Sequence, residues 1–314
     1  MQGKQANNMP TPSYVRDKAK LLKELNKAYM EMFNYLILAL TFNPNNPQVI
    51  REAMILRQMN IWITELNKSM GKSLEKLIYK TFLEGQAYHM LAVGNVDTWA
   101  EAIAIAQFDA ISRPKVEALF ADTYNDILQA TNNTPLSVKK IVRDTVQKVA
   151  QYHSLKNTNY TEQANQLLKE LSKKGLSEQV AKEGFVGVID RKGRQWDLRT
   201  YSNMVIKTKV TQAFTEGVRH EAEVSGLDLA VISNHGAKDA CSKWEGVVIS
   251  LNGKTKGYPT YEQARATNEI WHPNCEHTLH PIRNLDLLHP DDRAIHEKKL
   301  KGLGNYKARV YNRK

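Results

Sequence analysis

Apolar residues that recur every three or four positions are the dominant pattern of the first 175 residues. Such spacing places apolar side chains on one face of an α-helix, and that face must be covered by a neighbour. The first series consists of Leu22, Leu25, Tyr29, Met32, Leu36 and Leu40. Ser13 is positioned to cap the helix that carries this series. The pattern predicts helices that pack against one another.

Proline, glycine and asparagine divide this helical region. The Asn-Pro-Asn-Asn-Pro segment at 43–47 ends the first helix, and Pro47 suits the first turn of the next one. The Met-Gly pair at 70–71 predicts a break before a third helix, and the Gly-Asn pair at 94–95 predicts another. The same apolar spacing predicts further helices over 98–110, 114–131, 137–152 and 160–171.

The pattern changes near residue 175, where short β-branched runs begin. These runs predict strands over 185–189, 194–196, 229–233 and 247–251. A long helical pattern returns over 200–224. The predicted fold class is therefore α+β, with a mainly helical N-terminal domain followed by a smaller mixed domain with short strands. The predicted divisions are a helical domain over 1–175, the α+β domain over 176–290 and a basic tail over 291–314.

The excess positive charge is confined to the two ends of the chain. There are 44 Lys and Arg against 33 Asp and Glu, and residues 1–30 and 298–314 together hold the whole excess. Basic termini either keep a chain soluble or bind a polyanion, because Lys and Arg release counterions from phosphates. Tyr306 and Tyr311 lie among the last basic residues and could stack on bases. The candidate nucleic-acid-binding residues are Lys298, Lys299, Lys301, Lys307, Arg309, Arg313 and Lys314.

The composition and the motifs exclude several classes of protein. Two cysteines in 314 residues do not make a disulfide scaffold, and they fit a reducing cytoplasm. The first twelve residues are polar, so no secretory leader is expected. The best apolar run, 33–42, is about half the ~20 residues that span a bilayer, so no membrane is expected. The sequence contains no complete phosphate-binding loop, zinc-protease motif, zinc-deaminase motif or nucleophile elbow.

Five potential metal ligands gather in the predicted α+β domain. Thiolate sulfur and imidazole nitrogen are the donors that zinc prefers, and four of them close a tetrahedral site. Their spacing matches no known zinc finger, so three interpretations stay open. The residues are buried cysteines with hydrogen-bonded histidines, or ligands of a structural zinc ion, or parts of a catalytic metal or thiol site. The five candidates are His235, Cys241, His272, Cys275 and His277.

The same domain resembles a family of phage proteins. Residues 233–246 (Ser-Asn-His-Gly-Ala-Lys-Asp-Ala-Cys-Ser-Lys-Trp-Glu-Gly) and the Asn-Cys-Glu-His segment at 274–277 are similar to motifs of the tailed-phage minor capsid protein type-two family. His235, Trp244, Cys275 and His277 match its pattern. The pattern commonly has Arg-Pro at 238–239, Gln at 245 and Arg at 276, whereas this chain has Lys-Asp, Glu and Glu. These departures weaken any argument for a fixed arginine role.

The resemblance implies a minor head protein that lies inside the virion near the portal, after assembly in the host cytoplasm. It implies the portal protein, capsid or scaffold proteins and double-stranded DNA as partners, and a part in head assembly, genome packaging or ejection. It brings no catalytic residue, so no enzyme activity is expected and no cofactor beyond a structural zinc ion. The alternatives are a metal-dependent hydrolase or nuclease, or an injected effector, built on the His/Cys residues.

Three neighbouring residues are expected to be structural. Gly236 and Ala237 are predicted to form a tight turn beside His235. Trp244 is predicted to anchor this loop in the core, with its indole N–H bonded to a carbonyl. A host DNA-binding protein is a weaker interpretation, because the helix over 200–224 mixes Lys and Arg with three Glu and lacks a basic face.

Overall fold

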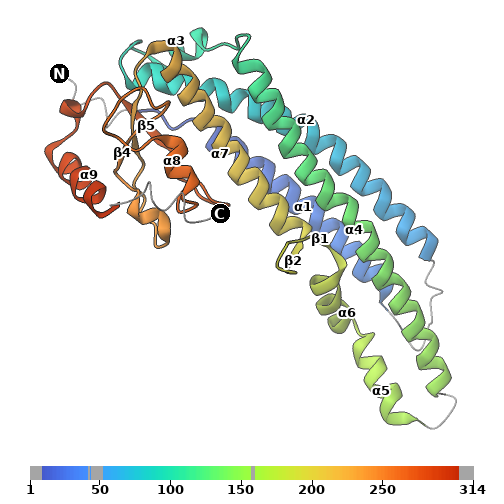
Figure 1. Ribbon diagram of the computed structural model, residues 1–314. Helices are drawn as coiled ribbons and strands as arrows, with labels where there is room; N and C mark the ends of the chain where they lie inside the picture. The colour runs from blue at the N-terminus through green and yellow to red at the C-terminus, as the bar shows by residue number, and fades with distance from the viewer. Residues whose placement is uncertain (1–8, 42, 44–51, 157–159, 304–314) are drawn as a thin grey trace. The chain divides into compact units, whose positions relative to one another are not determined.

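A computed structural model describes residues 9–41, 43, 52–156 and 160–303 (Figure 1). Helices make up most of it, with a few short strands, so the predicted helix-rich α+β class is confirmed. The α-helices are α1 (Tyr14–Leu40), α2 (Glu52–Ala92), α3 (Trp99–Ile105), α4 (Ser112–Lys156), α5 (Thr161–Glu170), α6 (Lys173–Gln179), α7 (Leu198–Ser225), α8 (Tyr261–Ala266) and α9 (Pro290–Leu303). The strands are β1 (Val186–Ile189), β2 (Gln195–Asp197), β3 (Leu229–Ile232), β4 (Val248–Ser250) and β5 (Leu279–Ile282).

The chain folds into two compact units, and each is assembled from several segments. Unit 1 comprises residues 1–19, 75–122 and 204–314, and unit 2 comprises 20–74 and 123–203. The sequence predicts consecutive domains instead, with a division at residue 175. The observed divisions fall inside α1, α2, α4 and α7. Apolar spacing reveals that a helix has a buried face, but it does not reveal where along the helix the packing partners change.

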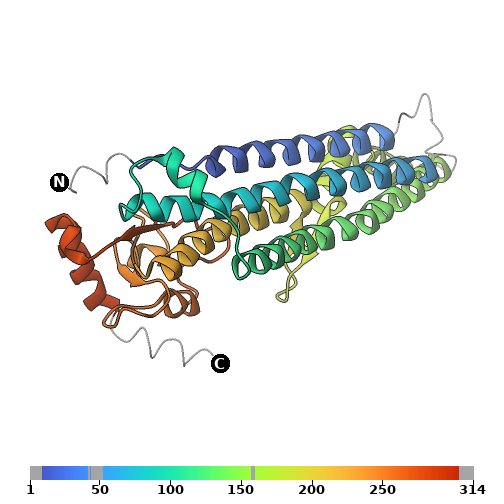
Figure 2. The same cartoon turned by 90° about the horizontal axis from the view of Figure 1, so that it is seen from above.

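The larger core of unit 2 is aliphatic and aromatic. Parts of α1, α2, α4, α6 and α7 contribute to it, and Leu36, Leu40 and Ile141 are fully buried there. The ring of Phe185 packs at 4.9 Å from that of Tyr29. Figure 2 shows the α1, α2 and α4 portions of this unit running alongside one another. This core is what the three-to-four spacing of the sequence predicts.

The predicted break at Met70 and Gly71 is wrong, because α2 continues through both residues. Gly71 lies in the helix because a larger side chain would not fit beside its neighbour. A Cβ atom added to Gly71 would lie 3.1 Å from the ring of Tyr124, so the absent side chain makes room for the tyrosine. A glycine in a helix costs roughly 0.5–1 kcal/mol relative to alanine, and packing of the partly buried Tyr124 ring works against this cost.

The predicted division between helices over 114–131 and 137–152 is also wrong. A single helix, α4, passes through Pro135. Proline removes one backbone hydrogen bond and strains the preceding turn. The hydroxyl of Thr134 donates to the carbonyl oxygen of Ala130 at 3.0 Å, and Ala130 and Val138 are buried in the core of unit 2. Burial on both sides of the proline therefore keeps the helix continuous.

The hairpin and the sheet form where the β-branched runs predict them. In unit 2, β1 pairs with β2 in an antiparallel hairpin. In unit 1, the strand order is β4-β3-β5 and both pairings are antiparallel. Strand β5 is not predicted by the sequence, because His280 and Pro281 interrupt its apolar run. None of the helices in the described part of the chain combines the length and the apolar character that a bilayer span requires.

Two helices of unit 1 approach each other closely. A Cβ atom added to Gly217 of α7 would collide with the carbonyl oxygen of Phe82, and one added to Gly85 of α2 would collide with that of Phe214. The two glycines therefore let the backbones of α2 and α7 come into contact. This contact holds α7 in position at the end that leads into β3.

The first part of the predicted basic tail over 291–314 is helical, because residues 290–303 form α9. Pro290 occupies the first helical position, and Asp291 and Asp292 lie in the first turn, where carboxylates interact favourably with the helix dipole. His296 and Leu303 are buried. The imidazole Nδ1 of His296 accepts the backbone N–H of Val248 at 3.0 Å, so α9 is bonded to β4, an outer strand of the sheet.

Candidate metal centre

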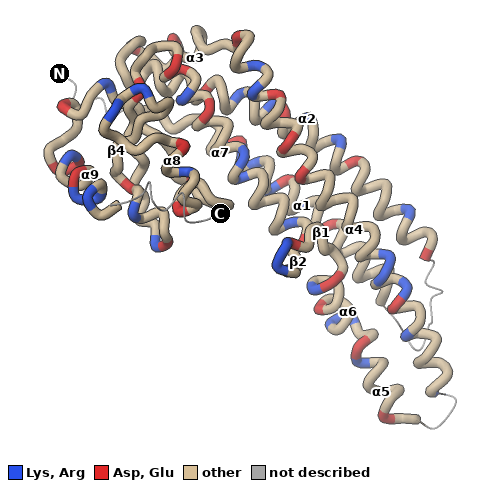
Figure 3. Tube along the Cα trace, in the orientation of Figure 1, with Lys and Arg blue, Asp and Glu red and all other residues tan. Residues whose placement is uncertain are grey.

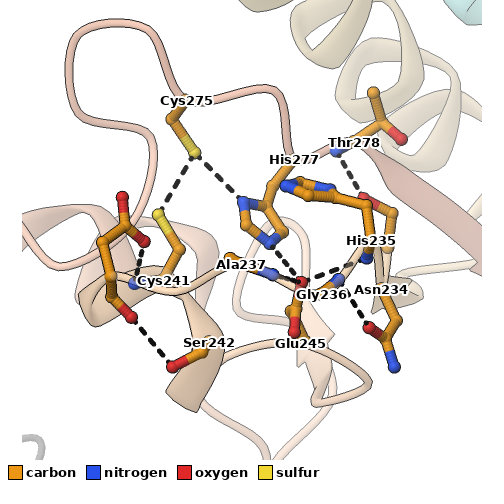
Figure 4. A network of polar contacts seen from close by, with 12 residues as sticks. Asn234, His235, Gly236, Ala237, Cys241, Ser242, Glu245, Cys275, His277 and Thr278 are labelled. Carbon is orange, nitrogen blue, oxygen red and sulfur yellow. Dashed lines mark hydrogen bonds and ion pairs between the residues drawn. The ribbon is translucent and has the colours of Figure 1, made fainter.

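Four of the five predicted ligands are linked by contacts to sulfur, and they lie on two loops of unit 1. Cys241 lies on a 3₁₀ turn over Ala240–Lys243, and Cys275 lies in the loop between α8 and β5. Their Sγ atoms are 3.7 Å apart, and both thiols are free and buried. The Nδ1 atom of His277 lies 3.2 Å from Cys275 Sγ. Figure 4 shows the Cys241, Cys275 and His277 side chains pointing toward one another.

A buried carboxylate organises the other side of His277. Glu245 accepts hydrogen bonds from the backbone N–H groups of His235 (3.0 Å) and Ala237 (2.9 Å), and its Oε1 lies 3.3 Å from His277 Nε2 (Figure 4). Gly236 has φ +73°, which glycine adopts without strain, so the chain turns tightly between these two donors. Glu245 thus fixes both the 235–237 turn and the His277 ring. Residue type alone does not reveal these contacts of Glu245.

The environment of Glu245 and His277 favours a carboxylate beside a neutral imidazole. Burial opposes ionisation of Glu245, but the hydrogen bonds from Ala237, His235 and His277 hold its pKa below the usual range. Burial, with His235 adding to it, lowers the pKa of His277 despite the attraction of Glu245. A carboxylate can only accept hydrogen bonds, so His277 must donate from Nε2. Its Nδ1 lone pair therefore faces Cys275.

His272 approaches the sulfur atoms from the partly exposed side. Its Nε2 lies 2.8 Å from Cys241 Sγ and 3.3 Å from a carboxylate oxygen of Asp239. Its Nδ1 lies 2.9 Å from the carbonyl oxygen of Pro273. The Pro273 carbonyl and the Asp239 carboxylate both accept hydrogen bonds, so a neutral His272 donates to only one of them. In the tautomer that donates from Nδ1 to Pro273, Nε2 presents its lone pair. Asp239 also accepts the backbone N–H of Cys241 at 3.0 Å, and its bonds to Cys241 lower its pKa.

His235 lies apart from the sulfur atoms. It is exposed, and its ring packs on that of His277 with 4.1 Å between the centroids. The potential ligands therefore fall into three overlapping groups whose ligand atoms lie within 4.8 Å of one another in each group. These groups are Cys241, Cys275 and His277; His235, Glu245 and His277; and Asp239, Cys241 and His272.

Trp244 is completely buried beside this centre. Its indole N–H donates to the side-chain carboxylate of Glu269 at 3.2 Å, where a carbonyl was expected as the acceptor. Lys243 Nζ reaches the other oxygen of Glu269 at 2.9 Å. The backbone N–H of Trp271 donates to Cys275 Sγ at 3.3 Å. Glu269 and Trp271 escape sequence reasoning because their partners lie in other loops and no spacing connects them.

A family comparison identifies the chain at this point. The family model for phage minor capsid protein 2 matches residues 53–309, most of the chain and all of the centre described above. The chain belongs to the phage minor capsid protein 2 family. No curated protein and no solved structure matches it. As a member of this structural family, it is a component of the phage capsid and contacts other phage structural proteins.

The basic residues of this minor capsid protein differ in their surroundings. Lys298 and Lys301 are exposed on α9. Lys299 is partly buried, and its Nζ donates to the carbonyl oxygen of Ser242 at 2.7 Å, so it bonds α9 to the 3₁₀ turn that carries Cys241. The other four candidates lie outside the described residues and are Lys307, Arg309, Arg313 and Lys314.

Proposed function

We propose that this minor capsid protein works inside the phage head, near the portal, by binding double-stranded DNA without sequence specificity. In this role it assists head assembly, genome packaging or ejection and catalyses no reaction. The observation that carries the proposal is the charge distribution, because the entire positive excess lies within residues 1–30 and 298–314. Basic side chains without base-reading partners bind phosphates alone.

Exposed basic residues near both ends support DNA binding. On α1, the exposed residues Lys20, Lys23 and Lys27 follow Arg16 along the helix, and Lys298 and Lys301 are exposed on α9. Figure 3 shows further blue segments at the β1–β2 turn, which contains Arg191 and Lys192 among other residues. Phosphate contacts of this type depend on charge and not on a shaped pocket.

Exposed apolar side chains on the helices of unit 2 support contact with portal or capsid proteins. Leu38 is 66% exposed and Leu136 is 68% exposed, although both are large aliphatic residues on helices. Met54 and Ile61 are also exposed on α2. Apolar surface of this kind is stabilised when another protein covers it. We therefore assign protein contacts to the helical unit and DNA contacts to the basic segments.

A mobility-shift titration with full-length protein and a long DNA duplex tests the DNA contact. The variant replaces Lys307, Arg309, Arg313 and Lys314 with Gln. It leaves α9 intact, whereas a truncation at residue 297 would remove the buried Leu303. We expect weaker binding, and a plot of log affinity against log salt that is shallower by about 3–4, or about 0.9 for each lost phosphate contact.

The matched control removes the same charge elsewhere. Lys72, Lys76, Lys139 and Lys140 are exposed on α2 and α4, and their replacement by Gln also lowers the net charge by four. We expect this control to keep most of the affinity and the salt dependence. Equal affinity and equal salt slopes for the two variants would contradict a specific role of the C-terminal residues.

The alternative of a metal-dependent hydrolase finds little support in the centre. Glu245 is the buried carboxylate nearest His277, and two backbone donors and His277 already engage it, so it holds a loop in place. We expect DNA incubated with the protein and divalent cations to stay intact. Cleavage that is lost in His277→Ala would establish the enzyme interpretation.

A further inference from the structure

Both cysteines and His277 place three ligand atoms close together, as a tetrahedral metal site requires, and His272 lies against one of the two sulfurs. With bonds of about 2.3 Å to sulfur and about 2.0 Å to nitrogen, a tetrahedral zinc ion holds two sulfurs about 3.8 Å apart. Cys241 Sγ and Cys275 Sγ are 3.7 Å apart. Because that spacing is far above the ~2.05 Å of a disulfide, the thiols are arranged as two separate ligands.

His277 supplies the third donor in the tautomer that ligation requires. Glu245 engages Nε2 at 3.3 Å, and Nδ1 faces Cys275 Sγ at 3.2 Å. A tetrahedral site places sulfur and nitrogen about 3.5 Å apart, so a small outward rotation of the ring admits an ion. A carboxylate on the far nitrogen is the usual orienting partner of a zinc-bound histidine.

His272 supplies the fourth donor in the tautomer that donates from Nδ1. The carbonyl oxygen of Pro273 engages its Nδ1 at 2.9 Å, and Nε2 faces Cys241 Sγ at 2.8 Å. The ring is partly exposed, and it borders a pocket of about 140 Å³ that also reaches Cys275. His272 can therefore turn toward the group formed by the other three ligands, and the pocket gives an ion a path to it.

We propose that Cys241, His272, Cys275 and His277 bind one structural zinc ion. The ion connects the 3₁₀ turn that follows β3 to the loop that precedes β5, so it closes a segment of more than thirty residues. The N–H of Trp271, which donates to Cys275 Sγ at 3.3 Å, stabilises the thiolate form that zinc requires. This site is independent of DNA binding.

The choice of ligands excludes three neighbouring residues for chemical reasons. His235 and Glu245 form a second group with His277, but it contains no sulfur, and Glu245 is already engaged by two backbone N–H groups. Asp239 competes with His272 for the fourth position, but its Oδ1 caps the 3₁₀ turn. Zinc favours thiolate and imidazole donors, so the group with two sulfurs is the preferred one.

Metal analysis of untagged full-length protein, purified without chelators, tests the site. We expect about one zinc ion per chain in the wild type and in the matched control His235→Gln. Cys241→Ser and Cys275→Ser should retain at least tenfold less zinc after dialysis, and His272→Ala should bind it at least tenfold more weakly. Far-UV circular dichroism reports whether each variant keeps its helices.

A second measurement needs no variant. Cobalt(II) in place of zinc should give the strong visible absorption of a tetrahedral thiolate site, and thiol modification by a mercurial should release the metal into a colorimetric indicator. Chelation should lower the melting temperature of the wild type. The proposal is overturned if the reduced wild-type chain binds neither metal after reconstitution, or if Cys275→Ser keeps the full zinc content. It is also overturned if the chain isolated from reducing cytoplasm carries a Cys241–Cys275 disulfide.

Discussion

The two units differ in where their reactive side chains lie. Unit 1 contains both cysteines and eight of the nine histidines, whereas unit 2 contains only His153. Among the described residues, every buried Asp, Glu or His belongs to unit 1. The buried polar side chains of unit 2 are Thr and Ser, and Thr134 bonds to its own helix. Unit 2 is therefore stabilised by repeated apolar contacts, and unit 1 by individual polar ones.

This difference bears on how each unit tolerates change. An apolar core loses stability in proportion to the area and volume removed. A polar contact such as that of Glu245 with His235, Ala237 and His277 leaves several buried groups unpaired when one partner is lost. Unit 1 should therefore be sensitive to pH and to metal removal, while unit 2 should respond mainly to the volume of its side chains.

The largest expected effect comes from removing one aromatic anchor in each unit. Trp244→Ala in unit 1 and Phe185→Ala in unit 2 each delete a side chain that is at most 1% exposed, at a cost of about 3–5 kcal/mol. Hydrogen–deuterium exchange should locate the damage. Trp244→Ala should speed exchange in β3, β4 and β5, and Phe185→Ala should speed it in residues 20–40 of α1 and 52–74 of α2.

The pair of variants serves as its own control. If each substitution speeds exchange only in its own unit, the units are separate in stability as well as in composition. If either substitution speeds exchange equally in both, the units unfold as one cooperative body and the comparison fails. Unchanged melting of Trp244→Ala would contradict its role as an anchor.

The sequence predicts the two units with unequal success. Periodic leucines and isoleucines predict the helices of unit 2, apart from the breaks wrongly expected at Gly71 and near Pro135, because burial overrides local propensity there. In unit 1, the β-branched runs predict β3 and β4, but β5 and α9 are missed. The Pro-Asp-Asp start of α9 was a usable signal.

The sequence predicts which residues belong to the candidate centre, but it does not predict how they are arranged in space. Residue type alone makes His235 a candidate metal ligand together with the other four, since all five lie in one predicted domain. Only the fold separates His235, which lies on the far side of His277 from the thiols, and only the fold brings Glu245 and Glu269 into contact with their partners. Contacts between loops carry no periodic signal, so zinc ligation stays a prediction.

Acid should destabilise unit 1 through His89, an effect of intermediate size. Burial lowers the pKa of His89 from 6.5 to about 4. The hydrogen bond to the carbonyl of Leu227 acts in the opposite direction and raises the pKa. The unfolded chain therefore takes up a proton first as the pH falls below 6.5, and stability declines until the pH reaches about 4. The loss amounts to about 3 kcal/mol. Urea unfolding of the wild type and His89→Gln between pH 7 and pH 4 measures it.

Comparing the pH dependence of stability in the wild type and in His89→Gln separates the effect of His89 from that of the other buried histidines. His89→Gln should lose less stability than the wild type over the same pH range, because its side chain cannot take up a proton. His153→Gln makes the same chemical change at an exposed position of unit 2 and should follow the wild-type profile. Parallel profiles for His89→Gln and the wild type would show that the acid sensitivity of unit 1 arises elsewhere.

The smallest expected changes in stability come from two glycine substitutions in helices of unit 1. One tests helix packing and the other tests helix propensity. Gly217→Ala adds a methyl group that meets the backbone of Phe82, so α2 and α7 must move apart, at a cost of about 1–3 kcal/mol. Gly302→Ala adds the same group to α9 in open space, and it should raise stability by about 0.5–1 kcal/mol through the better helix propensity of alanine. Chemical unfolding of both variants measures the opposite signs. If both variants are stabilised, the close approach of α2 and α7 is not needed, and unit 1 depends on its polar loops alone.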